Sequence, residues 1–224
     1  MGCADPDLRL IDGPAEAPAT LLLAHGAGAP PTSPFLATIA AGLAARNWRV
    51  VRFPFPYMTR QLLSGRRSAP DRLPRLLEAF REQVSLEGPG RPLILAGKSM
   101  GGRVASLLVD ELATAGAVQG CVCLGFPFHP PGRPLQLRGE HLATLRHPTL
   151  ILQGERDSFG RREEVETYPL SRQVTVRWIP SGDHSLRPTR SSGLAEEQTL
   201  EMAVAHIHRF CSGLPCGAPR AQGA

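Results

Sequence analysis

The sequence contains almost no lysine and few aromatic residues. Lys98 is the one lysine among 25 basic residues, and aromatic residues make up 5% of the 224 positions. The remaining basic residues are arginines spread over the whole chain, without aromatic residues interleaved among them. Despite a formal net charge of +5, this distribution argues against a nucleic-acid-binding protein. We expect no nucleic-acid partner.

Cysteines are few, and their spacing fits neither a metal site nor a disulfide framework. The five cysteines form no C-x-x-C pair. Cys121 and Cys123 alternate within an apolar run, which is typical of small buried side chains on one face of a strand in a reducing compartment. We therefore expect no metal and no other cofactor.

Long apolar runs are also missing. No stretch approaches the ~20 apolar residues that span a bilayer. Residues 1–6 lack the basic and apolar segments of a signal peptide. These absences predict a cytoplasmic protein without a membrane partner, and they leave its oligomeric state open.

Short apolar runs alternate with helical patterns along the chain. The apolar runs predict buried strands over residues 20–24, 48–53, 92–96, 120–124, 149–153 and 174–179, with residues 8–12 as a candidate edge strand. The helical patterns cover residues 34–46 behind a Ser33 cap, 71–86, 101–115, 139–145 and 196–211. This alternation predicts an α/β fold, with a doubly wound, mostly parallel sheet and helices on both faces.

The chain shows no internal repeat and no change of composition that would separate two domains. We expect one domain over residues 1–211, an ordered but mobile loop over 53–70, and a disordered tail over 212–224 that is rich in Gly, Pro and Ala. The short, Pro-rich connection over residues 126–147 predicts a small or absent lid. Its apolar side chains either line a pocket or belong to the core: Phe126, Phe128, Leu135 and Leu137.

The strongest motif follows the predicted strand over residues 92–96. Gly97-x-Ser99-x-Gly101 lies between this strand and a helix, which is the nucleophile-elbow pattern. A residue in such a turn takes strained backbone angles, and its neighbours two positions away must be small. The pattern predicts an exposed nucleophilic Ser99, although a helix-capping serine would occupy a similar position.

A serine nucleophile requires a histidine base and a carboxylate that orients it. Asp157 follows the predicted strand over residues 149–153, and His184 follows the strand over 174–179. Both lie at ends of strands that meet at one edge of a parallel sheet. Asp183 is an alternative acid, but adjacent side chains usually diverge, so we favour Asp157.

An acyl-transfer site also needs two donors for the oxyanion. The backbone N–H of Met100, directly after Ser99, is the first candidate. The predicted strand over residues 20–24 ends in His25-Gly26-Ala27-Gly28, where small residues let a backbone N–H approach, and Ala27 is our choice for the second donor. We interpret His25 as a structural residue that holds this loop.

Together these residues resemble the α/β-hydrolase superfamily, and its dienelactone-hydrolase-like branch in particular. Longer phrases are similar to small bacterial hydrolases grouped with Tex-type proteins and with a subunit of the non-specific-lethal chromatin complex. The resemblance covers about residues 20–210 and is carried by residues 24–28 (AHGAG), 97–103 (GKSMGGR), 129–132 (HPPG), 137–142 (LRGEHL) and 148–160 (PTLILQGERDSFG). It implies the α/β-hydrolase fold and an intact triad of Ser99, Asp157 and His184.

The sequence therefore predicts a serine hydrolase that acts on a small ester-like substrate, such as a carboxylester, thioester or lactone, through an acyl-enzyme. The alternative is a binding or scaffold protein that retains the triad without using it. Lys98 either pairs with a nearby carboxylate or carbonyl or binds substrate. The arginines within residues 60–75 either form a solvated surface or attract an anionic substrate.

Overall fold

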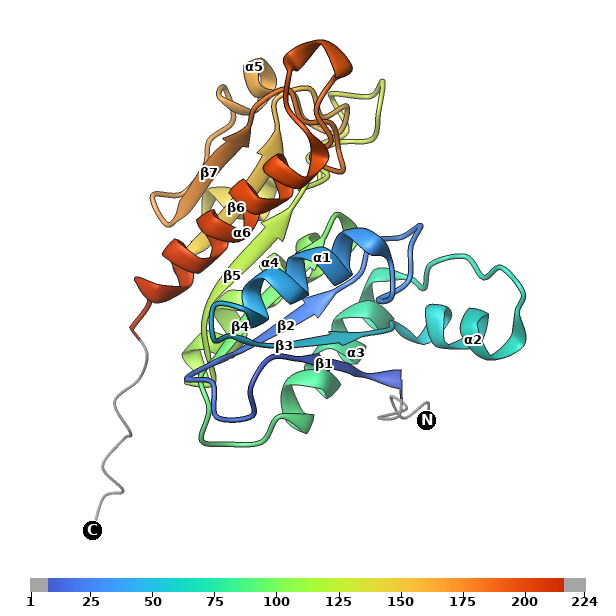
Figure 1. The fold of residues 1–224 in the computed structure, drawn as a ribbon, viewed down its shortest axis with the longest axis vertical. Helices are drawn as coiled ribbons and strands as arrows, with labels where there is room; N and C mark the ends of the chain where they lie inside the picture. The colour runs from blue at the N-terminus through green and yellow to red at the C-terminus, as the bar shows by residue number, and fades with distance from the viewer. Residues whose placement is uncertain (1–7, 216–224) are drawn as a thin grey trace.

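A seven-stranded sheet forms the centre of the molecule in the computed structural model, which describes residues 8–215 (Figure 1). The strands are β1 (Leu10–Asp12), β2 (Thr20–Ala24), β3 (Arg49–Phe53), β4 (Leu93–Lys98), β5 (Val118–Leu124), β6 (Thr149–Gly154) and β7 (Val174–Ile179). The helices are α1 (Pro34–Ala44), α2 (Pro56–Ser64), α3 (Leu73–Leu86), α4 (Met100–Thr114), α5 (Arg162–Val165) and α6 (Glu196–Ser212), with two 3-10 turns over Glu140–Ala143 and Arg190–Ser192.

The strand order is β1-β3-β2-β4-β5-β6-β7. Only β1, at one edge, is antiparallel to its neighbour β3, and all other neighbouring strands are parallel. The predicted fold class is thus confirmed, and the candidate edge strand forms over Leu10–Asp12. The order of connection reverses between β2 and β4. In open α/β sheets, ligands bind outside the carboxyl ends of the strands at this switch point.

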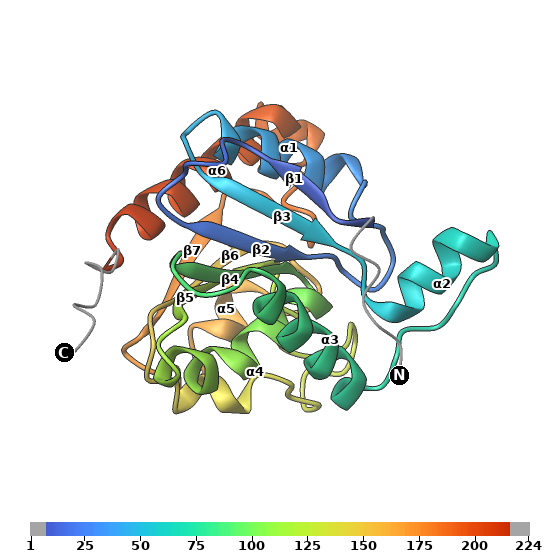
Figure 2. The ribbon, with the colours of Figure 1, turned by 90° about the horizontal axis from the view of Figure 1, so that it is seen from below.

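Helices cover both faces of the sheet, as Figure 2 shows. Helices α1 and α6 contact each other on one face, and α3 and α4 contact each other on the other. The central strands are buried along their whole length, because both of their faces are covered: β2, β4 and β6. Strand β7 lies at the second edge, and its side chains alternate between exposed and partly buried. Each face has its own apolar cluster.

The segment after β3 differs from the predicted loop, because it contains helix α2 (Figure 1). Pro56 stands in the first turn, where its missing N–H costs nothing, and Gly65 ends the helix in the left-handed conformation. The Asp71 carboxylate accepts the N–H of Tyr57 at 2.8 Å and a guanidinium N–H of Arg60 at 2.6 Å. The sequence pattern missed α2 because its buried residues, Tyr57 and Met58, are adjacent and show no helical period.

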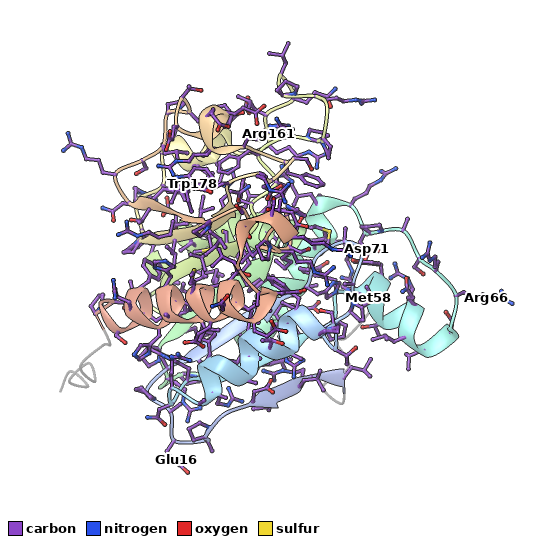
Figure 3. All side chains as sticks on the ribbon, turned by 45° about the horizontal axis from the view of Figure 1, so that its top comes forward. Glu16, Met58, Arg66, Asp71, Arg161 and Trp178 are labelled. Carbon is purple, nitrogen blue, oxygen red and sulfur yellow. The ribbon has the colours of Figure 1, made fainter. Side chains whose placement is uncertain are left out.

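The arginines near α2 lie mainly at the surface. Arg66 stands at the outer tip of this segment and points away from the body of the molecule (Figure 3). Arg60 pairs with Asp71, and Arg75 pairs with Glu78 at 2.6 Å. The structure therefore favours the solvated surface over a cluster of free cations above the sheet edge.

The connection between β5 and β6 contains no regular element other than the 3-10 turn over Glu140–Ala143. Phe126 and Phe128 are buried in the core, with ring centroids 4.8 Å apart, whereas Leu135 is 96% exposed. Phe128 and Leu137 line a small cavity of about 150 Å³ that shares no residue with the pocket at Ser99. This part of the described chain therefore places no helical lid over the sheet edge.

The predicted tail begins later than residue 212. Helix α6 extends to Ser212, and Leu214 is buried in the apolar cluster on the α1 and α6 face. Because the surrounding residues are mostly small, the sequence composition gave no indication that Leu214 is buried. The remainder of the predicted tail, residues 216–224, lies outside the described residues. Of the helices within residues 8–215, none combines the length and the apolar character that a membrane span requires.

The apolar cluster beneath α3 offers a test of the core. Phe53 is fully buried, and its ring packs edge-on against Phe80 with centroids 5.1 Å apart. We expect Phe53→Ala to lower the free energy of unfolding by about 3–5 kcal/mol in urea titrations, since it leaves a cavity. The matched variant Leu63→Ala removes a side chain that is 68% exposed, and it should change stability by less than about 0.5 kcal/mol. Equal losses in the two variants would contradict the core assignment.

Candidate active site

Ser99 lies in a strained turn between β4 and α4. Its backbone angles are φ 50° and ψ −114°, a combination that non-glycine residues rarely adopt. The Ser99 N–H donates to the Leu124 carbonyl at 2.9 Å, and the Arg103 N–H donates to the Ser99 carbonyl at 3.0 Å. The turn is therefore tied both to the neighbouring strand β5 and to the first turn of α4.

The flanking glycines of the motif are sterically required. A Cβ on Gly97 would lie 2.3 Å from the Gly101 carbonyl carbon, and a Cβ on Gly101 would lie 2.6 Å from the His25 carbonyl oxygen. Strand and helix approach each other at this point more closely than any side chain permits. The turn between β4 and α4 has the close backbone approach that the Gly97-x-Ser99-x-Gly101 pattern predicts, and Ser99 lies at the carboxyl edge of the sheet; its role as a nucleophile stays a prediction.

The structure brings the three predicted side chains together from the ends of β4, β6 and β7. Nε2 of His184 lies 2.8 Å from Oγ of Ser99, and Nδ1 of His184 lies 2.8 Å from Oδ2 of Asp157. Because an ionised carboxylate only accepts hydrogen bonds, Nδ1 carries the ring proton. Nε2 is then free to accept the proton of the Ser99 hydroxyl.

Asp157 is fully buried, and three donors surround its carboxylate. Besides His184, the Gln153 side-chain amide donates to Oδ2 at 2.9 Å and the Phe159 N–H donates to Oδ1 at 2.8 Å. The Gln153 amide also bonds to both backbone groups of Phe126. A buried carboxylate is tolerated only when it is paired and hydrogen-bonded in this way.

The alternative acid, Asp183, has a different role in the structure. Its Oδ1 accepts the N–H groups of Ser185 at 2.7 Å and Arg187 at 3.0 Å, which closes the turn that carries His184. The Asp183 carboxylate therefore shapes the backbone of this turn, while the imidazole of His184 turns to Asp157.

The loops after β6 and β7 are bonded to each other. The Arg156 N–H donates to the Gly182 carbonyl at 2.9 Å, and the Ser181 N–H donates to Oε2 of Glu155 at 2.9 Å. A Cβ on Gly154 would lie 2.3 Å from the Asp183 carbonyl oxygen. This close backbone packing fixes the distance between the acid and the histidine.

The ring of His184 is also held from its flat side. The Phe159 ring stacks on it with centroids 4.1 Å apart and an interplanar angle of 29°. Since His184 is bonded through both ring nitrogens and stacked on one face, its orientation is fixed toward Ser99.

His25 supports the loop after β2 and takes no part in the contacts of Ser99. It is fully buried, and its Nε2 accepts the Phe55 N–H at 3.0 Å. Its Nδ1 therefore carries the proton and donates to the Gly26 carbonyl at 2.7 Å. The Tyr57 hydroxyl lies 3.0 Å from the Ala27 carbonyl oxygen, so it also supports this loop.

Two backbone N–H groups near Ser99 remain unpaired. Among residues 8–215, neither Met100 nor Ala27 has a hydrogen-bond partner for its backbone N–H. Met100 is the first residue of α4, where the helix dipole favours negative charge. Both residues are the ones that the sequence predicted as oxyanion donors.

A pocket of about 460 Å³ opens beside Ser99 and His184. Its walls come from the loop after β2, the start of α1 and the turn after β7, including Ala27, Phe35 and Arg187. No aspartate or glutamate lines it. Within residues 8–215, no group of three or more His, Cys, Asp or Glu side chains is arranged to hold a metal ion.

The residues that support the site are poorly marked in the sequence. Gln153 ends a predicted strand, and its buried polar side chain at the sheet edge is a usable sign of a polar network. The sequence gives no indication that Phe159 and Gly125 lie near the site, because their contacts with His184 join loops that are distant in the chain.

The buried histidine in the β2 loop predicts a pH dependence of stability. Burial lowers the pKa of His25 from 6.5 to about 4, against a smaller opposite effect of its bond to Gly26. Between these two pKa values the unfolded chain binds more protons than the folded protein. The free energy of unfolding therefore falls as the pH drops from about 6.5 to 4, and this contribution does not change with pH above that range. In chemical unfolding measured across this range, we expect His25→Gln to lose about 3 kcal/mol less than the wild type. Parallel curves for the two proteins would contradict this assignment.

Comparison with known proteins relates this fold to hydrolases. Dienelactone hydrolase from Anabaena variabilis superposes with a TM-score of 0.69 at 18% identity, over 92% of this chain and 91% of that one. An alpha-beta serine hydrolase homologue from Coxiella burnetii gives a TM-score of 0.65 at 18% identity, over 90% and 89% of the two chains. The esterase domain of a Rhodothermus marinus protein gives 0.65 at 16% identity, over 92% of each.

At these identities the superpositions establish the fold alone. The sequence itself matches the alpha/beta hydrolase domain over residues 17–212. This match includes every strand of the parallel part of the sheet and all three side chains at its carboxyl edge. The protein belongs to the alpha/beta hydrolase family.

Proposed function

We propose that the protein is a serine hydrolase that cleaves a small ester-like substrate through an acyl-enzyme. The observation that carries this proposal is the pair of 2.8 Å contacts that His184 makes, one with Ser99 and one with Asp157. A serine hydroxyl that donates to an oriented imidazole is an activated nucleophile. The family match and the esterase-like structural neighbours support a hydrolase of this type.

In the first half-reaction, Oγ of Ser99 forms a bond to the substrate carbonyl carbon. Its proton passes to Nε2 of His184, and the carbonyl electron pair moves onto the oxygen. The tetrahedral intermediate then collapses, and the bond to the leaving alcohol or thiol breaks as that group takes the proton from Nε2. Asp157 stabilises the imidazolium that exists between these two transfers.

In the second half-reaction, water takes the place of the leaving group. His184 removes a proton from the water, and the resulting oxygen nucleophile attacks the acyl carbon. When the second tetrahedral intermediate collapses, Oγ of Ser99 regains its proton from Nε2 and the carboxylic acid is released. The enzyme returns to its starting state without a cofactor in either step.

The oxyanion of both intermediates is stabilised by the backbone N–H groups of Met100 and Ala27. Both are unpaired within residues 8–215, and the Met100 N–H lies at the positive end of α4. At Gly26 the β2 loop lies against the elbow, where a Cβ would be in ordinary van der Waals contact with Cβ of Ser99 at 3.6 Å.

The pocket favours short acyl groups. It encloses about 460 Å³, which is at the lower end of the range for pockets that hold small molecules. The β5–β6 connection supplies no helical lid over it, so an accessible carboxylester, thioester or lactone fits better than a long lipid chain. The resemblance of several sequence segments to the small Tex-type hydrolases stays a prediction, and it is in line with such a compact form.

The alternative from another class is a binding protein that retains the triad without turnover. Reaction with a fluorophosphonate probe separates the two functions, because the probe modifies only an activated serine. Labelling of the folded wild type supports the enzyme, and absence of labelling supports the binding protein.

We expect Ser99→Ala to abolish fluorophosphonate labelling and to lower kcat by a factor on the order of a million for any short-chain ester that the wild type hydrolyses. The matched control is Ser106→Ala, because Ser106 also contacts a histidine, with Oγ 2.8 Å from Nε2 of His141. Ser106 is fully buried and its hydroxyl donates to the Arg103 carbonyl, so its loss should leave labelling intact. Labelling that persists in Ser99→Ala and disappears in Ser106→Ala would refute the assignment.

The choice of acid is tested by two neutral isosteres. Asp157→Asn should lower kcat by about 10⁴-fold, because an amide donor opposite Nδ1 favours the wrong tautomer of His184. Asp183→Asn should reduce kcat far less, since Asp183 bonds only to amides of its own turn. Steady-state kinetics at saturating substrate measure both effects, and the reverse order of losses would assign the role to Asp183.

A further inference from the structure

The single lysine of the chain lies directly before Ser99. Lys98 is the last residue of β4, and only 9% of it is exposed. Every other basic residue of the 25 is an arginine. A buried ammonium group carries a desolvation cost that a surface arginine does not, so its presence at this one position calls for a local function.

The ammonium group of Lys98 contacts the backbone of the base. Nζ donates to the carbonyl oxygen of His184, across 86 residues of sequence. The side chain thus connects the nucleophile strand β4 to the turn after β7. This bond acts on the peptide group of His184, while Asp157, Ser99 and Phe159 hold its ring.

The space for this contact is kept open by Gly125. Its φ is +62°, and a Cβ there would lie 2.6 Å from the His184 carbonyl oxygen and 2.8 Å from Nζ of Lys98. Only a backbone without a side chain fits against the pair. We expect a planar guanidinium, which is larger than an ammonium group and donates in a fixed fork, to reproduce this contact poorly.

Charges around Lys98 keep it protonated near neutral pH. Burial lowers the pKa of Lys98 to about 8, while the carboxylates of Asp157 and Asp183 oppose this shift. The Phe35 ring, whose centroid lies 5.6 Å from Nζ, covers the side chain from α1. The ammonium thus faces the His184 carbonyl as a charged donor, which is stronger than a neutral one.

We propose that Lys98 is a positioning residue for the base: its ammonium group, in the slot beside Gly125, holds the His184 backbone so that the imidazole meets both Ser99 and Asp157. This inference rests on the proposed function, because its consequence is the reactivity of Ser99. It differs from a role in substrate binding, in which Lys98 would contact the bound ester from the pocket that it lines.

The experiment compares Lys98→Met, Lys98→Arg and Lys98→Gln with wild type. We expect all three to lower kcat and the rate of fluorophosphonate labelling together by about 100-fold, since a displaced base costs this order of rate, with KM unchanged. Arg49→Met is the matched control, because Arg49 is a partly buried cation at the amino end of β3 that bonds to Glu87 and Thr20. It should lower Tm without slowing the labelling of folded protein.

A second pair of variants tests the contact between Lys98 and the His184 carbonyl by changing the glycine that lies against it. Gly125→Ala should reproduce the loss of labelling, because its Cβ displaces Nζ and the His184 carbonyl. Gly132→Ala is its control, since Gly132 has a similar φ of +71° with nothing within 4 Å of its Cβ position. Gly132→Ala therefore introduces similar backbone strain without a steric clash, and we expect this variant to be labelled by the fluorophosphonate at the wild-type rate.

A readout independent of turnover is the low-field ¹H NMR signal of the proton between His184 and Asp157, identified by its loss in His184→Ala. We expect Lys98→Met to shift or broaden it and Arg49→Met to leave it unchanged. An unchanged signal with unchanged labelling in the Lys98 variants, full activity in Lys98→Arg, or a rise in KM at constant kcat would each overturn the proposal. A wild type that is not labelled would instead refute the proposed function.

Discussion

The arrangement of the site depends on close backbone-to-backbone contact at the carboxyl edge of the sheet. At Gly97 the strand β4 meets the first turn of α4, at Gly125 the end of β5 meets His184, and at Gly154 the end of β6 meets the turn after β7. Each contact is too short for a Cβ atom. Because three neighbouring strands end in this way, the loops that carry Ser99, Asp157 and His184 lie in one small volume, and among the described residues no disulfide joins them.

Polar groups within this volume are arranged in order of burial. Asp157 lies deepest, and its charge is balanced by Gln153, the Phe159 amide and His184. His184 is partly exposed at the pocket, where its Nε2 faces Ser99. Exposure to solvent therefore increases from Asp157 to His184, and each group has a hydrogen-bond partner on its buried side. A network that is satisfied throughout stabilises one geometry, whereas a network with an unpaired member would not.

Much of the fold and of the candidate site could be predicted from the sequence, because both depend on local sequence patterns. The strand runs, the glycines two residues either side of Ser99, and the positions of Asp157 and His184 after later strands are all visible along the chain. Helix α2 could not be predicted, because its buried residues show no helical period. The predicted start of the tail is too early, because the isolated apolar residue Leu214 packs into the core and fixes the chain there. The sequence left open a carbonyl partner for Lys98 but could not identify it as His184, and it gave no sign of the close approach of Gly125 to His184, since both contacts join segments far apart in the chain.

The burial of Lys98 has a consequence for the outer surface of the molecule. With its one ε-amino group enclosed between β4, α1 and the turn after β7, the chain presents no lysine to the surrounding solution. Acetylation, ubiquitin attachment and amine-directed cross-linking all act on exposed ε-amines. On the described surface the permanent side-chain cations are therefore guanidinium groups, which hold a fixed charge at every physiological pH and offer reactions at ε-amines no point of attachment.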